Sequence, residues 1–411
     1  MDAGLPAERP PHVPEDRVVD FDMYAPPGVK QDFHAAWKAL QAPGVPDVVW
    51  TPRNGGHWIA TRNRLIDEVF SDHERFSSRV ILVPKAIGEQ HGLIPTTLDP
   101  PEHRPYRTLL NSSMAPKVVG ANEPRIRALA AELIEAVRRD GACNFTTAYA
   151  EILPIRIFLS MMDLPPGDAA QTKRWCDQML RPDGSMSFEE CMARLFDYLG
   201  PYVDARKGGD GDDMLSRMIN GRIGDRALTR DEALKLSVQV LIAGLDTVVN
   251  FLGFAMLFLA RNPAMSRELA GEPELMPAAV EEFLRRFPIV TIGREVARDM
   301  EYQGASLRKG EMILTPSVLG GIDERENERP MEVDFHRPTA AHVTFGSGHH
   351  KCPGAHLART EIRVTLEEWL KRIPEFSVAP GKTVEFTGGI VGVVDALPLV
   401  WDVETTRSLA A

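Results

Sequence analysis

The longest apolar stretch of the chain lies between residues 229 and 261. Thr229 and Glu232 have the spacing of a capping box, in which each side chain hydrogen-bonds to the backbone N–H of the other residue at a helix start. Asn262 and Pro263 supply the signal that ends a helix. Between residues 236 and 260 nearly every position is apolar, so no face is consistently polar. The pattern predicts one long helix buried in the core.

A membrane span is the competing interpretation of this stretch, because its length suffices. Four polar residues in its middle argue against a span, since polar groups are costly in hydrocarbon. They are Gln239, Asp246, Thr247 and Asn250. We therefore expect a helix that crosses a large core, with these residues facing a cavity.

Short segments rich in β-branched and aromatic residues predict a minor β portion. The expected pairs are residues 48–50 with 58–60 around Asn54-Gly55, Tyr302 with residues 312–314, and residues 384–386 with 397–400. The first is a strong hairpin signal, because Asn-Gly suits a tight turn. We expect one mainly helical domain over residues 21–411, preceded by a flexible leader over residues 1–20.

Composition narrows the possible functions. The chain has 411 residues, 44% of them apolar, which supports a sizeable core, and its net charge of −11 argues against nucleic-acid binding. Its four cysteines lack paired spacing, which fits a reducing compartment better than a disulfide framework. The first residues lack the apolar segment of a signal peptide. We expect a cytoplasmic monomer without a membrane anchor.

Cys352 is the strongest candidate for chemistry. It lies in residues 345–354, which read Phe-Gly-Ser-Gly-His-His-Lys-Cys-Pro-Gly. The glycines allow tight turns and close approach to something flat, and a following helix and a metal ion would favour a thiolate. These properties suit a haem iron held by one thiolate. The alternatives are a buried structural cysteine and a zinc site with His349 and His350, for which no second Cys/His cluster is visible.

This loop resembles the haem-binding loop of cytochrome P450 monooxygenases. Residues 243–247, Ala-Gly-Leu-Asp-Thr, resemble the oxygen-binding groove of that family. The resemblance implies that Thr247 hydrogen-bonds dioxygen, and that Asp246 controls proton delivery and pairs with Arg181. A simple buried ion pair is the alternative for Asp246. Gly244 would cost about 1 kcal/mol relative to alanine inside a helix, so we expect a compensating role, such as letting a ligand press against the backbone there.

A second resemblance is to the family's Glu-x-x-Arg motif. Glu282 and Arg285 share one helix face and can pair. The family match adds Arg337 as a third partner, and implies that the three residues stabilise the fold and haem retention. They are not expected to take part in chemistry.

The same resemblance implies haem b as the cofactor and assigns residues to it. Its two carboxylates need cations or donors. The residues implied to bind the cofactor are Cys352 as iron ligand, with Arg107, Arg294, His350, His103, Phe345 and Gly346. Pro353 departs from the family pattern. It has no N–H, which is expected to leave the sulfur more electron-rich.

Nearly the whole chain resembles the camphor-hydroxylating branch of the family, which implies a triangular, mainly helical fold and a small terpenoid-like substrate. The residues implied to contact the substrate are His91, Leu82, Thr96, Gln239, Ile242, Ala243, Val290 and Ile390. His91 replaces a tyrosine that binds the substrate carbonyl in those enzymes. A camphor-like or norisoprenoid ketone is therefore expected rather than camphor itself.

The expected activity is hydroxylation of an unactivated C–H bond with dioxygen. The resemblance implies electrons from a [2Fe–2S] ferredoxin and its NADH-dependent reductase, with a docking patch at Arg104, Arg107 and Lys351. Two alternatives stay open: a haem-thiolate peroxygenase that uses hydrogen peroxide, and a non-catalytic haem sensor. The paired Asp246 and Thr247 argue against both.

Overall fold

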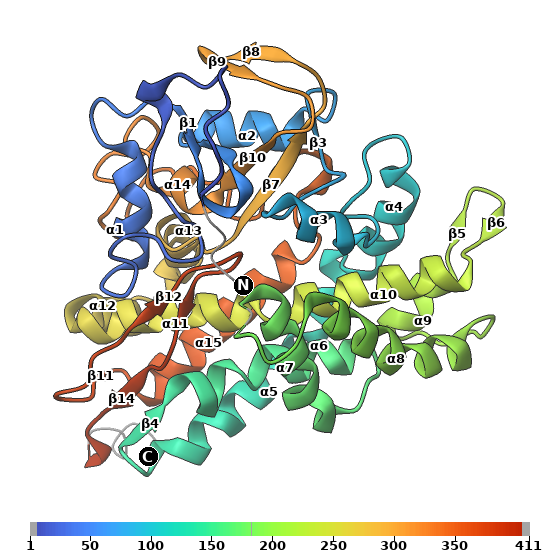
Figure 1. Ribbon diagram of the computed structural model, residues 1–411. Helices are drawn as coiled ribbons and strands as arrows, with labels where there is room; N and C mark the ends of the chain where they lie inside the picture. The colour runs from blue at the N-terminus through green and yellow to red at the C-terminus, as the bar shows by residue number, and fades with distance from the viewer. Residues whose placement is uncertain (1–5, 182, 405–411) are drawn as a thin grey trace.

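The structure, a computed structural model, describes residues 6–181 and 183–404. It is mainly helical with small sheets, as predicted, and Figure 1 shows a sheet-containing lobe above a broader helical lobe. The helices are α1 Phe33–Lys38, α2 Asn63–Ser71, α3 Lys85–His91, α4 His103–Ser113, α5 Pro116–Arg138, α6 Leu153–Met161, α7 Ala169–Leu180, α8 Phe188–Arg206, α9 Met214–Ile219, α10 Arg230–Leu245, α11 Thr247–Arg261, α12 Pro263–Gly271, α13 Met276–Arg286, α14 Ser317–Gly321 and α15 Ala355–Arg372. The strands are β1 Val48–Thr51, β2 His57–Ala60, β3 Phe76–Ser77, β4 Ala142–Asn144, β5 Arg222–Ile223, β6 Arg226–Ala227, β7 Thr291–Val296, β8 Met300–Tyr302, β9 Ala305–Leu307, β10 Met312–Pro316, β11 Ser377–Val378, β12 Phe386–Thr387, β13 Val393–Val394 and β14 Pro398–Val400.

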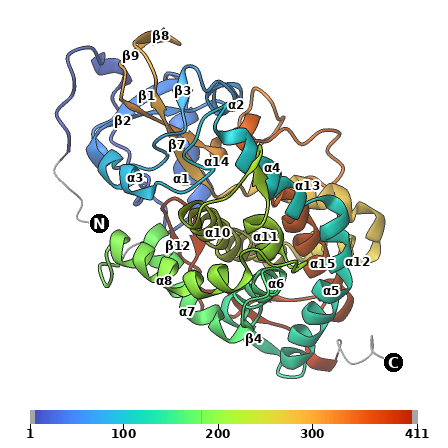
Figure 2. The ribbon, with the colours of Figure 1, turned by 90° about the vertical axis from the view of Figure 1, so that its right-hand side faces the viewer.

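Helices α10 and α11 form the axis of the helical lobe. The predicted capping box is present at its start, where Thr229 and Glu232 exchange hydrogen bonds, and α11 ends at Arg261 before Pro263 begins α12. α10 contacts α6, α7, α8 and α9, and α11 contacts α6, α12 and α15. Figure 2 shows the pair in the middle of the molecule, surrounded by other helices. Contacts on many sides explain the nearly uniform apolar sequence.

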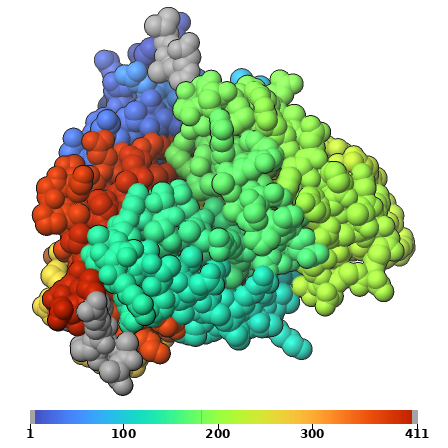
Figure 3. All heavy atoms as spheres, turned by 90° about the horizontal axis from the view of Figure 1, so that it is seen from below, coloured from blue at the N-terminus to red at the C-terminus, as the bar shows by residue number. Residues whose placement is uncertain are grey.

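The combined stretch Arg230–Arg261 is long and apolar enough to cross a membrane, but 78% of its most apolar window is buried inside the protein. In Figure 3, the face seen from below is covered by the teal and green helical residues and the red C-terminal strands. Contacts of α10 with α8 and of α11 with β11 and β13 join the long helix to these coverings. Burial by protein is what a core helix requires.

The prediction of one continuous helix is wrong at Asp246. This residue has φ −130° and ψ −40°, outside the helical range, and it separates α10 from α11. Its carboxylate accepts hydrogen bonds from Arg181 at 2.6 and 2.9 Å, at the end of α7, and its carbonyl accepts one from the side chain of Asn250 at 2.9 Å. The Arg181 contacts come from distant sequence and hold the residue off the helical path.

The largest sheet has the strand order β1-β2-β10-β7-β3. The hairpin predicted around Asn54-Gly55 is confirmed, with β1 and β2 antiparallel and Trp50 opposite Trp58. The other two predicted pairs are wrong. Tyr302 lies in β8, which pairs with β9, whereas β10 pairs with β7 and β2; β12 pairs with β13, and β14 pairs with β4 and β11. In both places a strand takes a distant partner instead of the one expected nearby.

Part of the expected leader packs against the sheet lobe. Val13 is buried, and Val19 N donates to Trp50 O at 2.8 Å beside a parallel bridge between Val18 and Trp50. Residues 13–19 are therefore part of the folded body. Residues 1–5 lie outside the described residues.

Candidate active site

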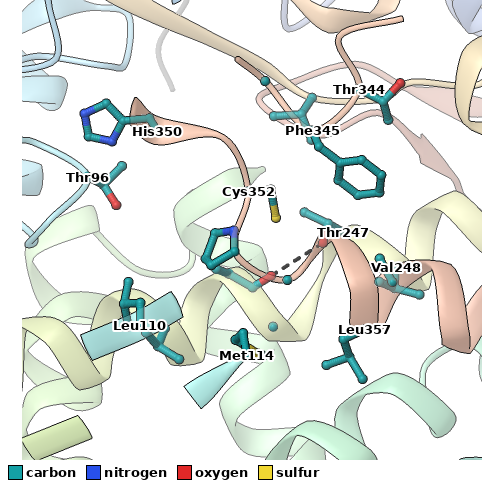
Figure 4. A pocket seen from close by; sticks show the side chains of 18 of the residues that line it. Thr96, Leu110, Met114, Thr247, Val248, Thr344, Phe345, His350, Cys352 and Leu357 are labelled. Carbon is teal, nitrogen blue, oxygen red and sulfur yellow. Dashed lines mark hydrogen bonds between the residues drawn. The ribbon is translucent and has the colours of Figure 1, made fainter. Parts of the chain in front are cut away.

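A cavity of about 340 Å³ lies between the long helix and the cysteine loop, the name used here for residues 345–354. Its walls are mostly apolar and come from α4, α6, α10, α11 and β7 as well as from the loop. Figure 4 shows Cys352 and Thr247 at this cavity, one from the loop and one from the start of α11. The structure thus brings together the two residues that the sequence singled out for chemistry.

Backbone contacts fix the cysteine loop. Gly346 and Gly348 have φ of 66° and 65°, a region that favours glycine, and a Cβ on Gly348 would lie 2.8 Å from Ser71 Cα. The N–H of Cys352 donates to Phe345 O at 2.8 Å, and α15 begins at Ala355, just after the cysteine. The loop therefore presents the sulfur at a helix N-terminus, with Phe345 beside it.

The surroundings of Cys352 explain why its sulfur needs a metal. Burial raises the pKa of the thiol, although a hydrogen bond from the Gly354 backbone and the charges of Arg107 and Arg359 lower it in part. Cys352 is nevertheless accessible, because its sulfur lines the cavity. A thiolate at this position requires a further positive charge, which iron supplies.

Arg294 is a buried cation with a free donor. It lies in β7 at 1% exposure, its Nη1 donates to Gly293 O at 2.9 Å, and its Nε has no partner in the described chain. Burial lowers the pKa of Arg294 to about 10, so it stays charged at neutral pH. A buried cation without an anion is costly. A haem carboxylate would compensate it, and this orphaned donor is the clearest sign that the cavity fits haem.

Three histidines stand beside this cation. The ring centroids of His103 and His350 are 4.3 Å apart, and those of His349 and His350 are 4.4 Å apart. Both ring nitrogens of His103 and the Nε2 of His349 are buried without a partner among the described residues, while His350 Nε2 contacts Leu98 O at 2.9 Å. Burial lowers the pKa of His103 and of His349 to about 4 and that of His350 to about 2, with help from nearby cations. A neutral ring has one N–H; that of His350 goes to Leu98 O, whereas His103 and His349 have an N–H that could be donated to an anion beside Arg294.

The zinc alternative is wrong. Of the described residues, those that could together hold a metal ion are Asp99, His349 and His350, and Cys352 is not among them. Asp99 already accepts hydrogen bonds from Ser77 Oγ and Ser78 N. His349, which the sequence offered only for zinc, instead belongs to the donors beside Arg294.

Arg107, from α4, connects the cavity to the cysteine loop. Its Nη2 donates to the carbonyl of Lys351, its Nε donates to Asn111 Oδ1 at 2.8 Å, and the residue lines the cavity. Phe345, Gly346 and His350 also line the cavity. Of the residues implied to bind the cofactor, only His103 does not line it, and it reaches the site through its contact with His350.

Asp246 and Thr247 have separate environments. Asp246 is buried in the ion pair with Arg181, with Lys173 Nζ at 3.3 Å, and does not line the cavity. Burial raises its pKa, but Arg181 and Lys173 outweigh that effect and hold the pKa below its ordinary range. Thr247 lines the cavity, and its hydroxyl lies 3.5 Å from Ala243 O, a long contact that leaves it available to a ligand.

Gly244 packs against an aromatic ring. A Cβ at this position would lie 2.5 to 2.6 Å from three ring atoms of Phe158 on α6. Both residues line the cavity. The neighbour that presses against the helix backbone is therefore Phe158, which the sequence analysis did not identify.

The implied substrate residues divide into two groups. Thr96, Gln239, Ala243 and Val290 line the cavity. Leu82, His91, Ile242 and Ile390 are buried behind its wall. His91 Nε2 lies 3.1 Å from Gln239 Oε1, so the histidine meets a cavity residue rather than the cavity.

Glu361 on α15 is a lining residue that the sequence analysis missed. Its Oε1 is buried without a partner in the described chain, and burial raises its pKa well above the ordinary range. The sequence did hold a signal for this residue, because its carboxyl lies among apolar positions of a helix. Burial beside the cavity thus favours its protonated form.

The Glu282–Arg285 pair is present and buried. Arg285 makes two hydrogen bonds of 2.7 Å to Glu282, and also donates to the carbonyls of Gly321, Pro330 and Glu332. Arg337 Nε lies 3.1 Å from Glu282, as the resemblance implied. The group joins α13 and α14 to the segment that leads to the cysteine loop.

Comparison with known proteins agrees with this site. The family model for cytochrome P450 matches residues 177–387. The chain is 33% identical over 402 residues to a probable cytochrome P450 127A1 of Sinorhizobium fredii, with 95% of this chain and 96% of that protein covered. The crystal structure of CYP101J2 has a TM-score of 0.89 and 46% identity, and that of CYP101C1 a TM-score of 0.89 and 42% identity; each match covers 96% of this chain and 100% of the other. The similarity extends far beyond the cysteine loop.

Proposed function

Because the chain belongs to the cytochrome P450 family and is a haem-thiolate monooxygenase, we propose that it hydroxylates an unactivated C–H bond of a compact terpenoid-like ketone, camphor-like or norisoprenoid. The observation that carries this proposal is the shared cavity of Thr247 and Cys352, mostly apolar and about 340 Å³ in volume. Such a cavity suits a small apolar molecule with one or two polar contacts.

The cofactor is haem b with a cysteine thiolate ligand, and Cys352 is the residue we assign to that role. Arg107, Arg294 and His103 would hold its carboxylates, His350 would lie beside them with its N–H on Leu98 O, and Phe345 and Gly346 would lie against the haem. When bound, haem supplies the activation of dioxygen and the oxidation of the C–H bond, with the thiolate favouring O–O cleavage.

The chain's own residues supply binding and protons. The apolar walls bind the substrate and displace water. The Thr247 hydroxyl lines the cavity and would donate a hydrogen bond to dioxygen there. Asp246 is ionised and held by Arg181, so it would have to leave the ion pair and take up a proton from solvent before passing one to the Thr247 hydroxyl. The final transfer of the proton uses positioned groups rather than bulk water.

Electrons would come from a [2Fe–2S] ferredoxin and its NADH-dependent reductase. Arg104 and Lys351 are exposed, and Arg107 joins them through its hydrogen bond to the Lys351 carbonyl. A basic patch beside the cysteine loop fits an acidic partner, although the whole chain has a net charge of −11. We place the enzyme in the cytoplasm as a monomer.

Two measurements test this function. The reduced holoprotein under carbon monoxide should give the absorption maximum of a thiolate-bound haem. Turnover with NADH, reductase and ferredoxin should then give an alcohol from a terpenoid ketone. Product formed only with hydrogen peroxide would identify a peroxygenase, and no product under either condition would favour a haem sensor.

A further inference from the structure

Gln239 lies on the same helix face as the proposed proton donor. Gln239, Ala243 and Thr247 are spaced by four residues, and all three line the cavity. Eight helical residues rise about 12 Å, and the break at Asp246 falls at the end of this stretch. A ligand held by Gln239 at one end would therefore present its other end to Thr247.

The polar groups on the cavity wall are mostly committed to other partners. The hydroxyl of Thr344 donates to Leu284 O at 2.6 Å, and that of Ser317 donates to Val290 O at 2.6 Å. Arg107, Arg294 and His350 belong to the cofactor side. Thr247 is assigned to dioxygen, and Glu361 lies on α15, the helix that follows Cys352. In the part of the chain that the structure describes, Gln239 and Thr96 are then left as the polar groups open to a substrate.

His91 determines how the Gln239 amide is oriented. His91 is 7% exposed, and its Nε2 lies 3.1 Å from Gln239 Oε1. An amide oxygen only accepts, so His91 Nε2 is the protonated nitrogen. The other ring nitrogen, Nδ1, is buried without a partner among the described residues. It then carries a lone pair, which is less costly to leave unpaired than an N–H.

The reverse arrangement is less favourable. If the amide nitrogen donated to His91 Nε2, the proton would move to Nδ1, where a buried N–H would have no acceptor. The cavity would then meet an amide oxygen and would select alcohols. Burial also lowers the pKa of His91 to about 4, so the ring is neutral and offers no charge to an acid.

We propose that the Gln239 amide N–H is the hydrogen-bond donor to a neutral acceptor oxygen of the substrate, a ketone or an ether, and that His91 is a positioning residue that acts only through Gln239. This inference rests on the proposed function and narrows its substrate class. The polar contact fixes one end of the substrate, so it also restricts which C–H bonds face Thr247.

The test uses matched ligands and the ferric holoprotein. Camphor, its hydrocarbon camphane and its alcohol borneol share one skeleton, and adamantanone with adamantane gives a second ketone–hydrocarbon pair. Dissociation constants are taken from the shift of the ferric absorption band. We expect each ketone to bind the natural protein about tenfold more tightly than its hydrocarbon, which corresponds to one well-made hydrogen bond, and more tightly than the alcohol.

Variants separate the donor from its support. Gln239→Leu should bring the ratio of ketone affinity to hydrocarbon affinity near one, while the hydrocarbon affinity itself changes less than about twofold. His91→Phe should lower the ratio, and His91→Gln, which can still donate to the Gln239 oxygen, should restore it. Thr96→Val tests the other open polar group; if Gln239 is the donor, this variant should keep the ratio of ketone to hydrocarbon affinity.

Several outcomes overturn the proposal. A ratio that survives Gln239→Leu, a ratio lost in Thr96→Val, tighter binding of borneol than camphor, or no preference for either ketone in the natural protein would each do so. The carbon monoxide spectrum is recorded on every sample. If it shows a thiolate-bound haem while the ratios fail, the substrate inference falls and the monooxygenase function stands; if it does not, both fall.

Discussion

Replacement of Gly244 by alanine tests why α10 contains a glycine at this position. Alanine is a better helix former by about 1 kcal/mol. The added Cβ would, however, lie 2.5 to 2.6 Å from three ring atoms of Phe158, whereas carbon atoms prefer about 3.5 to 4.0 Å. The ring would have to move by about 1 Å, and overpacking of this kind costs about 1 to 3 kcal/mol. We expect a net loss of about 1 kcal/mol in the free energy of unfolding.

The assay is urea unfolding of the holoprotein in two backgrounds. With Phe158→Ala the three obstructing atoms, Cγ, Cδ1 and Cδ2, are gone, so Gly244→Ala should become stabilising by up to about 1 kcal/mol. Gly120 on α5 is a matched control, because it is exposed and a Cβ there would meet nothing within 4 Å. Gly120→Ala should be stabilising in both backgrounds. An equal loss from Gly244→Ala with and without the ring would refute the packing explanation and favour a role in ligand contact.

Three further predictions concern the site. Thr247→Ala should make hydrogen peroxide the main product of electron use, since a positioned proton donor contributes 10²–10⁴-fold. Thr247→Ser should keep NADH consumption coupled to product formation. The ratio of peroxide formed to NADH consumed measures this, and an unchanged ratio in the alanine variant would show that Thr247 does not deliver protons. Pro353→Leu and Pro353→Ala should both raise the haem reduction potential, because each adds an N–H beside the Gly354 donor near the sulfur. Potentiometric titration measures the potential, and an unchanged or lower value would show that the missing N–H does not affect the iron. Burial raises the pKa of Glu361, so the folded state binds its proton more tightly than the unfolded state, which loses it above about pH 4.3. Natural stability should therefore fall as the pH rises above that value, and Glu361→Gln should gain stability relative to the natural protein as the pH rises from 5 to 8. A constant difference between their free energies of unfolding would argue against a buried proton.

Local signals predicted the features that depend on neighbouring residues. The capping box at Thr229, the stop at Pro263 and the turn at Asn54-Gly55 are all present. The glycine loop around Cys352 also follows from its own sequence, since the positive φ angles fall on Gly346 and Gly348.

What the residues alone did not predict depends on contacts from distant sequence. Asp246 leaves the helix because Arg181 and Lys173 hold its carboxylate. Tyr302 and β10 take different partners because pairing with β7 and β2 is decided by the sheet as a whole. His91 contacts Gln239 rather than the cavity, because Gln239, on α10, lies between the histidine ring and the cavity. Resemblance to a family supplied residue roles, but not these orientations.

Residues 13–19 also protect the rim of the five-stranded sheet. β1 is an outer strand there, and the Val18–Trp50 bridge and the hydrogen bond from Val19 occupy backbone groups that would otherwise face water. Unpaired outer strands invite pairing with another chain. A chain trimmed to start after residue 19 would retain every group at the haem cavity, but it would expose the unpaired edge of β1. We expect such a chain to self-associate through this edge while keeping its catalytic groups.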